Sequence, residues 1–361
     1  MTTTLDDLRR FAVTRSLFPP TTLAQAIDTL GFVQADPIRA PARAQDLTLR
    51  PRVTGYRAGD LERLYAKLPI EEDFFINYGF VTRALHGLMH PRAGLSPNAG
   101  NKRAAALLAF VREHGTVHPR DVDAHFSHGR VTNYWGGSSS ATTHMLELMH
   151  YKGVLRVAGR DTGIRLYSAR EPGDPVAGAK ARRDRLDALV DVVVNKYAPL
   201  PSSSLSYVIA RLRYAVPHWR ADVRSAQVRA RQRLSQAVVD GQTWYWPAGE
   251  VMPPTEAPEE VRLLAPFDPV VWDRRRFELL WDWAYRFEAY TPEPKRKLGY
   301  YALPLLWRDR VIGWVNASWR NGRLDATFGY VGGRPPRDRA FRRERDAEIE
   351  RFRGFLAGPA E

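Results

Sequence analysis

Cysteine is absent from the 361-residue sequence, and lysine is scarce. Without thiols the chain has no disulfide bonds, thiolate zinc sites, iron–sulfur clusters or cysteine nucleophiles. The histidines between positions 114 and 128 lack the carboxylate pattern that would complete a metal site. No apolar run approaches the roughly 20 residues that span a bilayer, and residues 1–10 carry no apolar signal segment. We therefore expect a cytoplasmic protein that binds no membrane, metal or cofactor.

Charge is strongly biased toward the positive sign. Lysine and arginine number 54 against 40 acidic residues, which gives a formal charge of +14, and 47 of the 54 cations are arginine. A positive surface suits a polyanion, and the planar guanidinium matches phosphates and base edges, although GC-rich coding sequences also enrich arginine. We predict a monomer that binds double-stranded DNA and associates with the nucleoid when bound.

The length exceeds what one hydrophobic core usually organises, so several packed segments are expected. The predicted fold class is mainly α with β (α+β), with tandem winged-helix modules and a small β-rich C-terminal domain. The predicted domains are a divergent N-terminal winged-helix region at 1–100, a second winged helix at 101–170, a third at 181–250, and a C-terminal α+β domain at 259–361.

The segment 101–170 carries the clearest winged-helix pattern. Three amphipathic helices, the last running from a serine triplet to His150, precede two alternating strands around a Gly/Asp turn. A hairpin that follows three helices is the wing of such a module. Ser138, Ser139 and Ser140 most simply cap the third helix, and as an alternative they bind a DNA phosphate at its N-terminus.

The later segments repeat this outline and then change character. A basic helix is predicted at 225–239, where Arg229 and Arg233 are candidate DNA contacts, followed by a strand from Gln242. Strands are expected at 300–307, 311–315 and 323–328 and a helix at 336–356, and the alternating aromatic residues at 281–287 are expected to pack in a core.

Near the N-terminus, helices are predicted at 5–17 and 22–31, the second capped by Thr21 or Thr22 and ended by Gly31. Asp36 follows shortly and precedes a proline, which favours extended backbone and a side chain presented by a turn.

Three collinear segments resemble the YcaQ-like/AlkZ-like winged-helix DNA glycosylases, in the subgroup with a Gln-x-Asp motif. Two are C-terminal, at 264–274 (Leu-Ala-Pro-Phe-Asp-Pro-Val-Val-Trp-Asp-Arg) and 290–301, and the third runs from Leu30 to Asp36 and into the basic stretch after it. The resemblance implies winged helices around a DNA channel and removal of N-alkylated or crosslinked purines. The chain departs from the family pattern at Gln45-Asp46, where histidines are common, and also at Tyr78 and Asn316.

Hydrolysis of an N-glycosidic bond requires a carboxylate that steadies positive charge on the sugar and orients or deprotonates water. The resemblance gives this role to Asp36, with Gln34 positioning water or sugar, and four arginines after the motif are candidate phosphate clamps. No lysine suggests a lyase nucleophile, so a monofunctional hydrolase is expected. The alternatives are that Asp36 merely starts a turn, and that the protein is a non-catalytic DNA-binding regulator. The four clamp candidates are Arg39, Arg43, Arg50 and Arg52.

Overall fold

The computed structural model describes residues 3–92, 102–126, 129–132, 138–171, 173, 176–252 and 257–357. The chain forms two compact units, each assembled from separate stretches of sequence. The first unit comprises Met1–Leu61, Val190–Ile209 and Gln227–Glu361, and the second comprises Glu62–Leu189 and Ala210–Ala226. The division into four consecutive domains stays a prediction. Within the described residues, no helix is both long and apolar enough to cross a membrane.

The N-terminal helices of the first unit begin and end where capping chemistry places them. Thr22 and Gln25 form a reciprocal capping box at the start of α2 (Leu23–Leu30). Gly31 ends the helix with φ of +63°, and a Cβ there would lie 2.8 Å from a methyl carbon of Val192. This ending directs the chain into β1 (Phe32–Gln34) and then to Asp36. The other helices of this part are α1 (Leu5–Ser16), α3 (Ala44–Leu49) and the 3-10 helix η1 (Arg50–Arg52).

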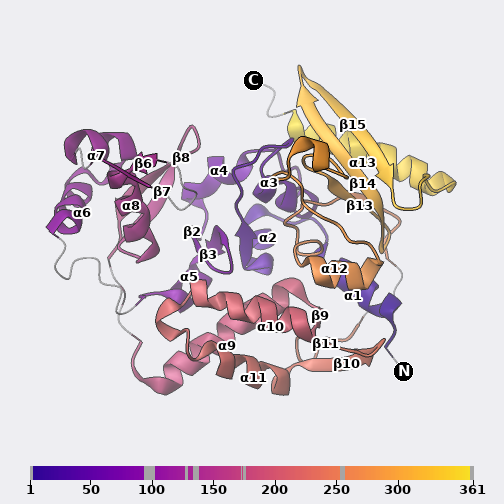
Figure 1. Cartoon of the computed structure of the whole chain (residues 1–361), viewed down its shortest axis with the longest axis horizontal. Helices are drawn as coiled ribbons and strands as arrows, with labels where there is room; N and C mark the ends of the chain where they lie inside the picture. The colour runs from indigo at the N-terminus through magenta and orange to yellow at the C-terminus, as the bar shows by residue number, and fades with distance from the viewer. Residues whose placement is uncertain are drawn as a thin grey trace. The chain divides into compact units, whose positions relative to one another are not determined.

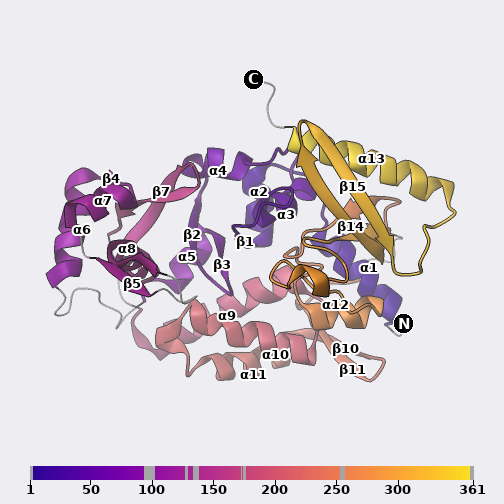
Figure 2. The same cartoon turned by 45° about the horizontal axis from the view of Figure 1, so that its top comes forward.

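A four-stranded antiparallel sheet in the order β12-β13-β14-β15 forms the C-terminal part of the first unit. In both cartoons α13 lies along this sheet, and Phe341 of α13 contacts the rings of Trp307 and Tyr330 (Figure 1, Figure 2). The aromatic alternation before the sheet forms no regular strand, but Tyr285 is buried, as predicted. The elements are α12 (Arg274–Trp281), η5 (Glu293–Lys295), β12 (Val261–Leu263), β13 (Leu303–Trp307), β14 (Arg310–Arg320), β15 (Arg323–Tyr330) and α13 (Arg339–Leu356).

The basic helix predicted at 225–239 is wrong in its second half. The helix α11 (Val223–Arg233) ends early, and β10 (Ser235–Val239) pairs with β11 (Gln242–Trp246). Asp240 and Gly241 both have positive φ, and an Asp-Gly turn of this kind favours a hairpin. The preceding elements are α9 (Gly178–Tyr197), β9 (Leu200–Pro201) and α10 (Ser202–Ala210).

The second unit contains the helices and hairpin that the sequence predicts at 101–170. Strands pair in the order β4-β8-β7, and Figure 2 shows α6, α7 and α8 gathered beside this hairpin. This arrangement agrees with the predicted α+β class.

The helices and strands of the second unit are α4 (Asp60–Leu64), β2 (Ile70–Phe74), β3 (Tyr78–Thr82), α5 (Arg83–Met89), α6 (Lys102–His114), β4 (Thr116–Val117), α7 (Pro119–Phe126), β5 (Arg130–Thr132), β6 (Ser138–Ser140), α8 (Ala141–Tyr151), β7 (Leu155–Asp161) and β8 (Ile164–Ala169). Its 3-10 helices are η2 (Tyr65–Lys67), η3 (Arg211–Tyr214) and η4 (Pro217–Trp219).

Candidate functional site

Asp36 lies two residues beyond β1, outside any helix or strand, and is held at both its side chain and its backbone. Its Oδ1 accepts a hydrogen bond of 2.9 Å from the backbone N–H of Ile38. Its own backbone N–H donates to Oε1 of Gln45 at 3.3 Å, and Gln45 is buried. The turn predicted around Asp36-Pro37 therefore presents a fixed carboxylate, because both contacts restrict the segment.

The environment of Asp36 makes its carboxylate a stronger base than an exposed one. The side chain is half-buried, and this burial raises the pKa of its carboxyl, an effect that the hydrogen bond from Ile38 partly offsets. A general base is most effective when its pKa approaches the working pH.

Gln34, the second residue of the predicted motif, is held by a tryptophan from a distant part of the chain. Nε1 of Trp272 donates to Oε1 of Gln34 at 2.8 Å. An indole N–H only donates, so this contact identifies the amide oxygen and fixes the direction of the amide. The ring of Trp272 lies beside the rings of Tyr197 and Tyr207, at centroid distances of 5.1 and 6.0 Å.

Two tyrosines that the sequence reasoning did not assign to the site feel the charge of Asp36. The negative charge of Asp36 adds to burial in raising the pKa of both Tyr290 and Tyr301. Tyr290 is 76% exposed, whereas Tyr301 is 3% exposed. Both stand in the segment 290–301 that carries the family resemblance, so this segment was the available signal.

A pocket of about 630 Å³ opens beside the loop that follows Asp36. Arg39 lines the pocket together with Arg296, Tyr300, Tyr301 and Asn316. Arg39 is exposed, as a phosphate contact must be.

Two of the four predicted phosphate clamps are structural instead. The guanidinium of Arg52 is 0% exposed and pairs with Asp268 through contacts of 2.7 and 3.0 Å. Arg50 is also buried and pairs with Glu348 at 2.5 Å. A buried guanidinium with a carboxylate partner has no face left for a phosphate, so clamping by Arg50 and Arg52 does not fit the structure.

The remaining candidates are placed as follows. Arg43 and Arg229 are half-buried, and Arg233 pairs with Asp191. Ser140 is the N-cap of α8, where its Oγ accepts from the backbone of Thr142 and Thr143, so the capping interpretation is confirmed for this serine. Ser138 and Ser139 lie in β6, and their side chains are outside the described part of the structure.

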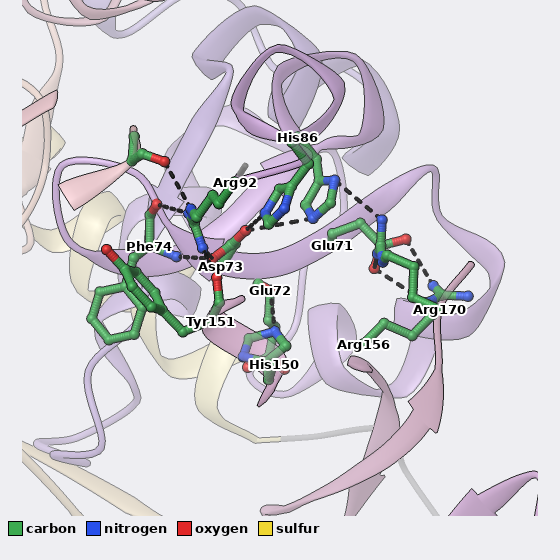
Figure 3. Close-up of polar contacts among 12 residues, drawn as sticks. Glu71, Glu72, Asp73, Phe74, His86, Arg92, His150, Tyr151, Arg156 and Arg170 are labelled. Atoms are coloured by element: carbon green, nitrogen blue, oxygen red, sulfur yellow. Dashed lines mark hydrogen bonds and ion pairs between the residues drawn. The ribbon is translucent and has the colours of Figure 1, made fainter. Parts of the chain in front are cut away.

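A buried polar cluster in the second unit was not predicted. Asp73 accepts from Arg92 at 3.1 Å and lies 3.4 Å from Nε2 of His86 (Figure 3). Nε2 of His90 lies 2.6 Å from the same carboxylate. Burial alone would raise the pKa of Asp73, but Arg92 and His90 outweigh it and hold the group ionised. Burial lowers the pKa of His86 to about 2, so this imidazole is neutral.

The ligand atoms of Asp73, His86 and His90 lie within 4.8 Å of one another, as they would around a metal ion. The two imidazole rings, however, are stacked at 4.1 Å with an interplanar angle of 10°, so their in-plane lone pairs lie in two nearly parallel planes and do not converge on one point. Arg170 also contacts Nδ1 of His86 at 3.1 Å (Figure 3), and a guanidinium only donates, which places the proton on Nε2. The cluster therefore satisfies a buried carboxylate and is a poor metal site.

Comparison with known proteins identifies the fold and the family of the chain. The structure is similar to Streptomyces sahachiroi DNA glycosylase AlkZ with a TM-score of 0.62 and 13% identity, over 99% of this chain and 98% of that one. At this identity the likeness shows the fold. The sequence model described as DNA glycosylase AlkZ-like matches residues 27–355, which include both Asp36 and the C-terminal sheet. The chain therefore belongs to the AlkZ-like family of DNA glycosylases.

Proposed function

We propose that this protein is a monofunctional DNA glycosylase that hydrolyses the N-glycosidic bond of N7- or N3-alkylated purines in duplex DNA, including crosslinked ones. The observation that carries the proposal is the Asp36 carboxylate, which is half-buried, raised in pKa and held by the N–H of Ile38, while Gln45 holds the backbone N–H of Asp36. The hydrogen bond from Ile38 is also that of an Asx turn, so the burial of the carboxyl is what distinguishes Asp36 from a solvated turn residue. Membership of the AlkZ-like family supports the reaction class.

In the proposed reaction Asp36 orients a water molecule toward C1′ of the deoxyribose. A bond forms between the water oxygen and C1′, and the bond from C1′ to the purine nitrogen breaks with its electron pair leaving on the base. An alkylated purine is cationic before cleavage and leaves as a neutral base, so no strong general acid is required. The proton of the water passes to Asp36, which also steadies the positive charge that develops on the sugar.

Hydrolysis fits the chain better than a lyase reaction, which needs an accessible amine. Lys196 has a pKa lowered to about 7, chiefly by burial, as activated lysines often do. Its side chain is nevertheless buried and donates to the backbone carbonyl of Phe32. We therefore assign Lys196 a structural role.

The proposed partner is duplex DNA, bound by a monomer. Of the predicted contacts we retain Arg39, Arg43, Arg229 and Arg233 as phosphate ligands. The pair between Arg233 and Asp191 is partly exposed, and such pairs contribute little, so exchange for a phosphate is inexpensive. Phosphate contacts would offset the few kcal/mol needed to unstack the damaged base.

Base release from duplex DNA containing N7-methylguanine tests the proposal. Wild-type protein should release the base, and Asp36→Asn should reduce the single-turnover rate by at least about 100-fold with DNA affinity unchanged. Asp28→Asn removes an exposed carboxylate of α2 and serves as the matched control, with no change expected.

Two results would contradict the assignment. Equal losses of binding and release in Asp36→Asn would give the residue a structural role. Specific DNA binding without release from any alkylated or crosslinked duplex would favour the alternative function, a non-catalytic DNA-binding protein.

A further inference from the structure

Three arginines from separate segments line the pocket of about 630 Å³ beside the loop that follows Asp36. Arg39 belongs to that loop, Arg296 follows η5, and Arg320 ends β14. Arg39 and Arg320 are exposed, and Arg296 is half-buried. We call this cavity the arginine pocket. It gathers charges of one sign in a small volume, which is unfavourable unless an anion balances them.

The three guanidinium groups have no carboxylate partner in the described part of the chain. Glu293 lines the same pocket but forms no ion pair with them among the described residues. By contrast, two arginines that line another pocket of this unit are paired, Arg262 with Glu260 at 2.5 Å and Arg351 with Glu348 at 2.9 Å. The positive charge of the arginine pocket is therefore left for a ligand to balance.

Arg296 is oriented without using the ends of its side chain. Its Nε donates to the carbonyl of Thr291 at 2.8 Å, and its Cζ lies 5.0 Å from the centre of the Tyr300 ring. The two terminal nitrogens form no hydrogen bond with the residues that the structure describes. These nitrogens form the edge with which a guanidinium binds phosphate oxygens.

The wall of the arginine pocket next to Arg296 is rigid. The carboxylate of Glu288 accepts from the backbone N–H groups of residues 297–299 at 2.8, 2.7 and 3.3 Å. Asn316, which also lines the pocket, donates its amide to the carbonyl of Leu298 at 2.7 Å. A wall held in this way loses little conformational freedom when a ligand binds.

Arg320 lies opposite a second arginine across the hairpin. In the register of β14 and β15 it pairs with Arg323, and Asn321 and Gly322, both with positive φ, form the turn between them. Like charges directly opposite each other on antiparallel strands destabilise the pair. Neither arginine has a carboxylate partner among the described residues. The end of this hairpin therefore adds positive charge that the described fold does not balance.

We propose that the arginine pocket binds phosphodiester groups of the DNA strand that carries the damaged base, with Arg39, Arg296 and Arg320 as the ligands. The flanking phosphates are within reach, because Arg39 follows Asp36 by three residues and at most about 11 Å of backbone separates them. This length covers about three nucleotides at roughly 3.4 Å each. The inference rests on the proposed function for its partner, duplex DNA, and adds Arg296 and Arg320 to the phosphate ligands.

Fluorescence anisotropy on duplex DNA tests the contacts with Arg296→Ala and Arg320→Ala. Each variant should reduce the slope of log affinity against log salt concentration by about 0.9, and the affinity at about 0.1 M salt roughly eightfold, because one phosphate contact is lost. Combining both with Arg39→Ala should reduce the slope by about 2.7. Arg353→Ala removes an exposed arginine that pairs with Glu350, and it should change neither quantity.

Urea denaturation without DNA provides a second measurement. Arg320→Ala should be as stable as the wild type or more stable, because it removes one of two like charges that face each other across the hairpin. A less stable Arg320→Ala with an unchanged salt slope would give this arginine a structural role and overturn its part in the proposal.

Base release separates the arginine pocket from the chemistry at Asp36. With saturating protein, the single-turnover rate of Arg320→Ala should equal that of the wild type. The protein concentration for half-maximal rate should rise roughly eightfold, because the phosphate is bound equally before and during the reaction. A lower maximal rate with unchanged affinity would contradict a role in binding.

The remaining outcomes distinguish the arginine pocket from the proposed function. Unchanged salt slopes in all three arginine variants would overturn the proposal, and release of base by the wild type would leave the glycosylase assignment standing. If thermal shifts with inorganic phosphate disappear in the variants while the DNA slopes stay the same, the pocket binds a small anion, which also overturns the proposal. Reduced slopes in a wild-type background that releases no base would support the pocket and reject the glycosylase assignment.

Discussion

Trp272 donates its indole N–H to the side-chain oxygen of Gln34 across 238 positions of sequence, at 2.8 Å. Trp272 belongs to the segment 264–274 and Gln34 to the Gln-x-Asp motif, so the contact joins two of the segments that carry the family resemblance. The amide of Gln34 is oriented by this bond, which makes Trp272 a positioning residue for Gln34.

Replacing Trp272 by phenylalanine should therefore slow chemistry more than binding. We expect a roughly tenfold lower single-turnover rate of base release with little change in DNA affinity, because one orienting hydrogen bond is lost. Trp281→Phe is a matched control, since the Trp281 indole donates to the carbonyl of Asp309 at 2.8 Å, away from Gln34. Equal activity losses in the two variants would show a general packing effect.

Asp36 should weaken the fold at neutral pH. Burial raises its pKa, so the folded state disfavours the carboxylate relative to the unfolded chain. This cost is present above the folded pKa and disappears as the pH falls below the unfolded value. Asp36→Asn should thus be more stable than the wild type at pH 7, with the difference shrinking toward pH 3 in urea titrations. A variant less stable at neutral pH would indicate that the ionised carboxylate supports the turn.

Arg52 should matter for stability and leave DNA binding unchanged in the folded protein. Arg52→Ala leaves Asp268 buried and unpaired, which should lower the free energy of unfolding by about 3–5 kcal/mol. Arg52→Met combined with Asp268→Leu removes both charges and should recover part of this loss in urea denaturation. A reduced salt dependence of DNA binding in the double variant would restore Arg52 as a phosphate contact.

Arg39 should matter for DNA binding and leave the stability of the fold unchanged. Arg39→Ala should keep the unfolding midpoint and reduce the slope of log affinity against log salt concentration by about 0.9, the value for one phosphate contact. Arg353→Ala, which removes an exposed arginine of α13, serves as the control, measured by fluorescence anisotropy on the same duplex. Identical slopes for all three proteins would exclude Arg39 from the interface.

The contrast between Arg52 and Arg39 shows what the sequence could and could not predict. Local signals were sufficient for the caps at Thr22 and Ser140, because capping depends on residues within one helical turn. The prediction of a helix through Val239 was wrong, because residues 235–239 form a strand of the hairpin that turns at Asp240-Gly241. Burial of Arg52 depends on Asp268, 216 positions away, which no local pattern reports.

The Asp73 cluster yields a prediction about metal ions. Because the rings of His86 and His90 are stacked, Zn²⁺ or a chelator should leave the thermal unfolding midpoint of the wild type unchanged. Asp73→Asn should lower the free energy of unfolding by about 3–5 kcal/mol, since Arg92 would lose its buried charged partner. A midpoint that rises with Zn²⁺ in the wild type but not in His90→Gln would instead identify a metal site. Such a site would require the two imidazoles to rotate apart, because in the stacked arrangement their lone pairs cannot meet at one ion.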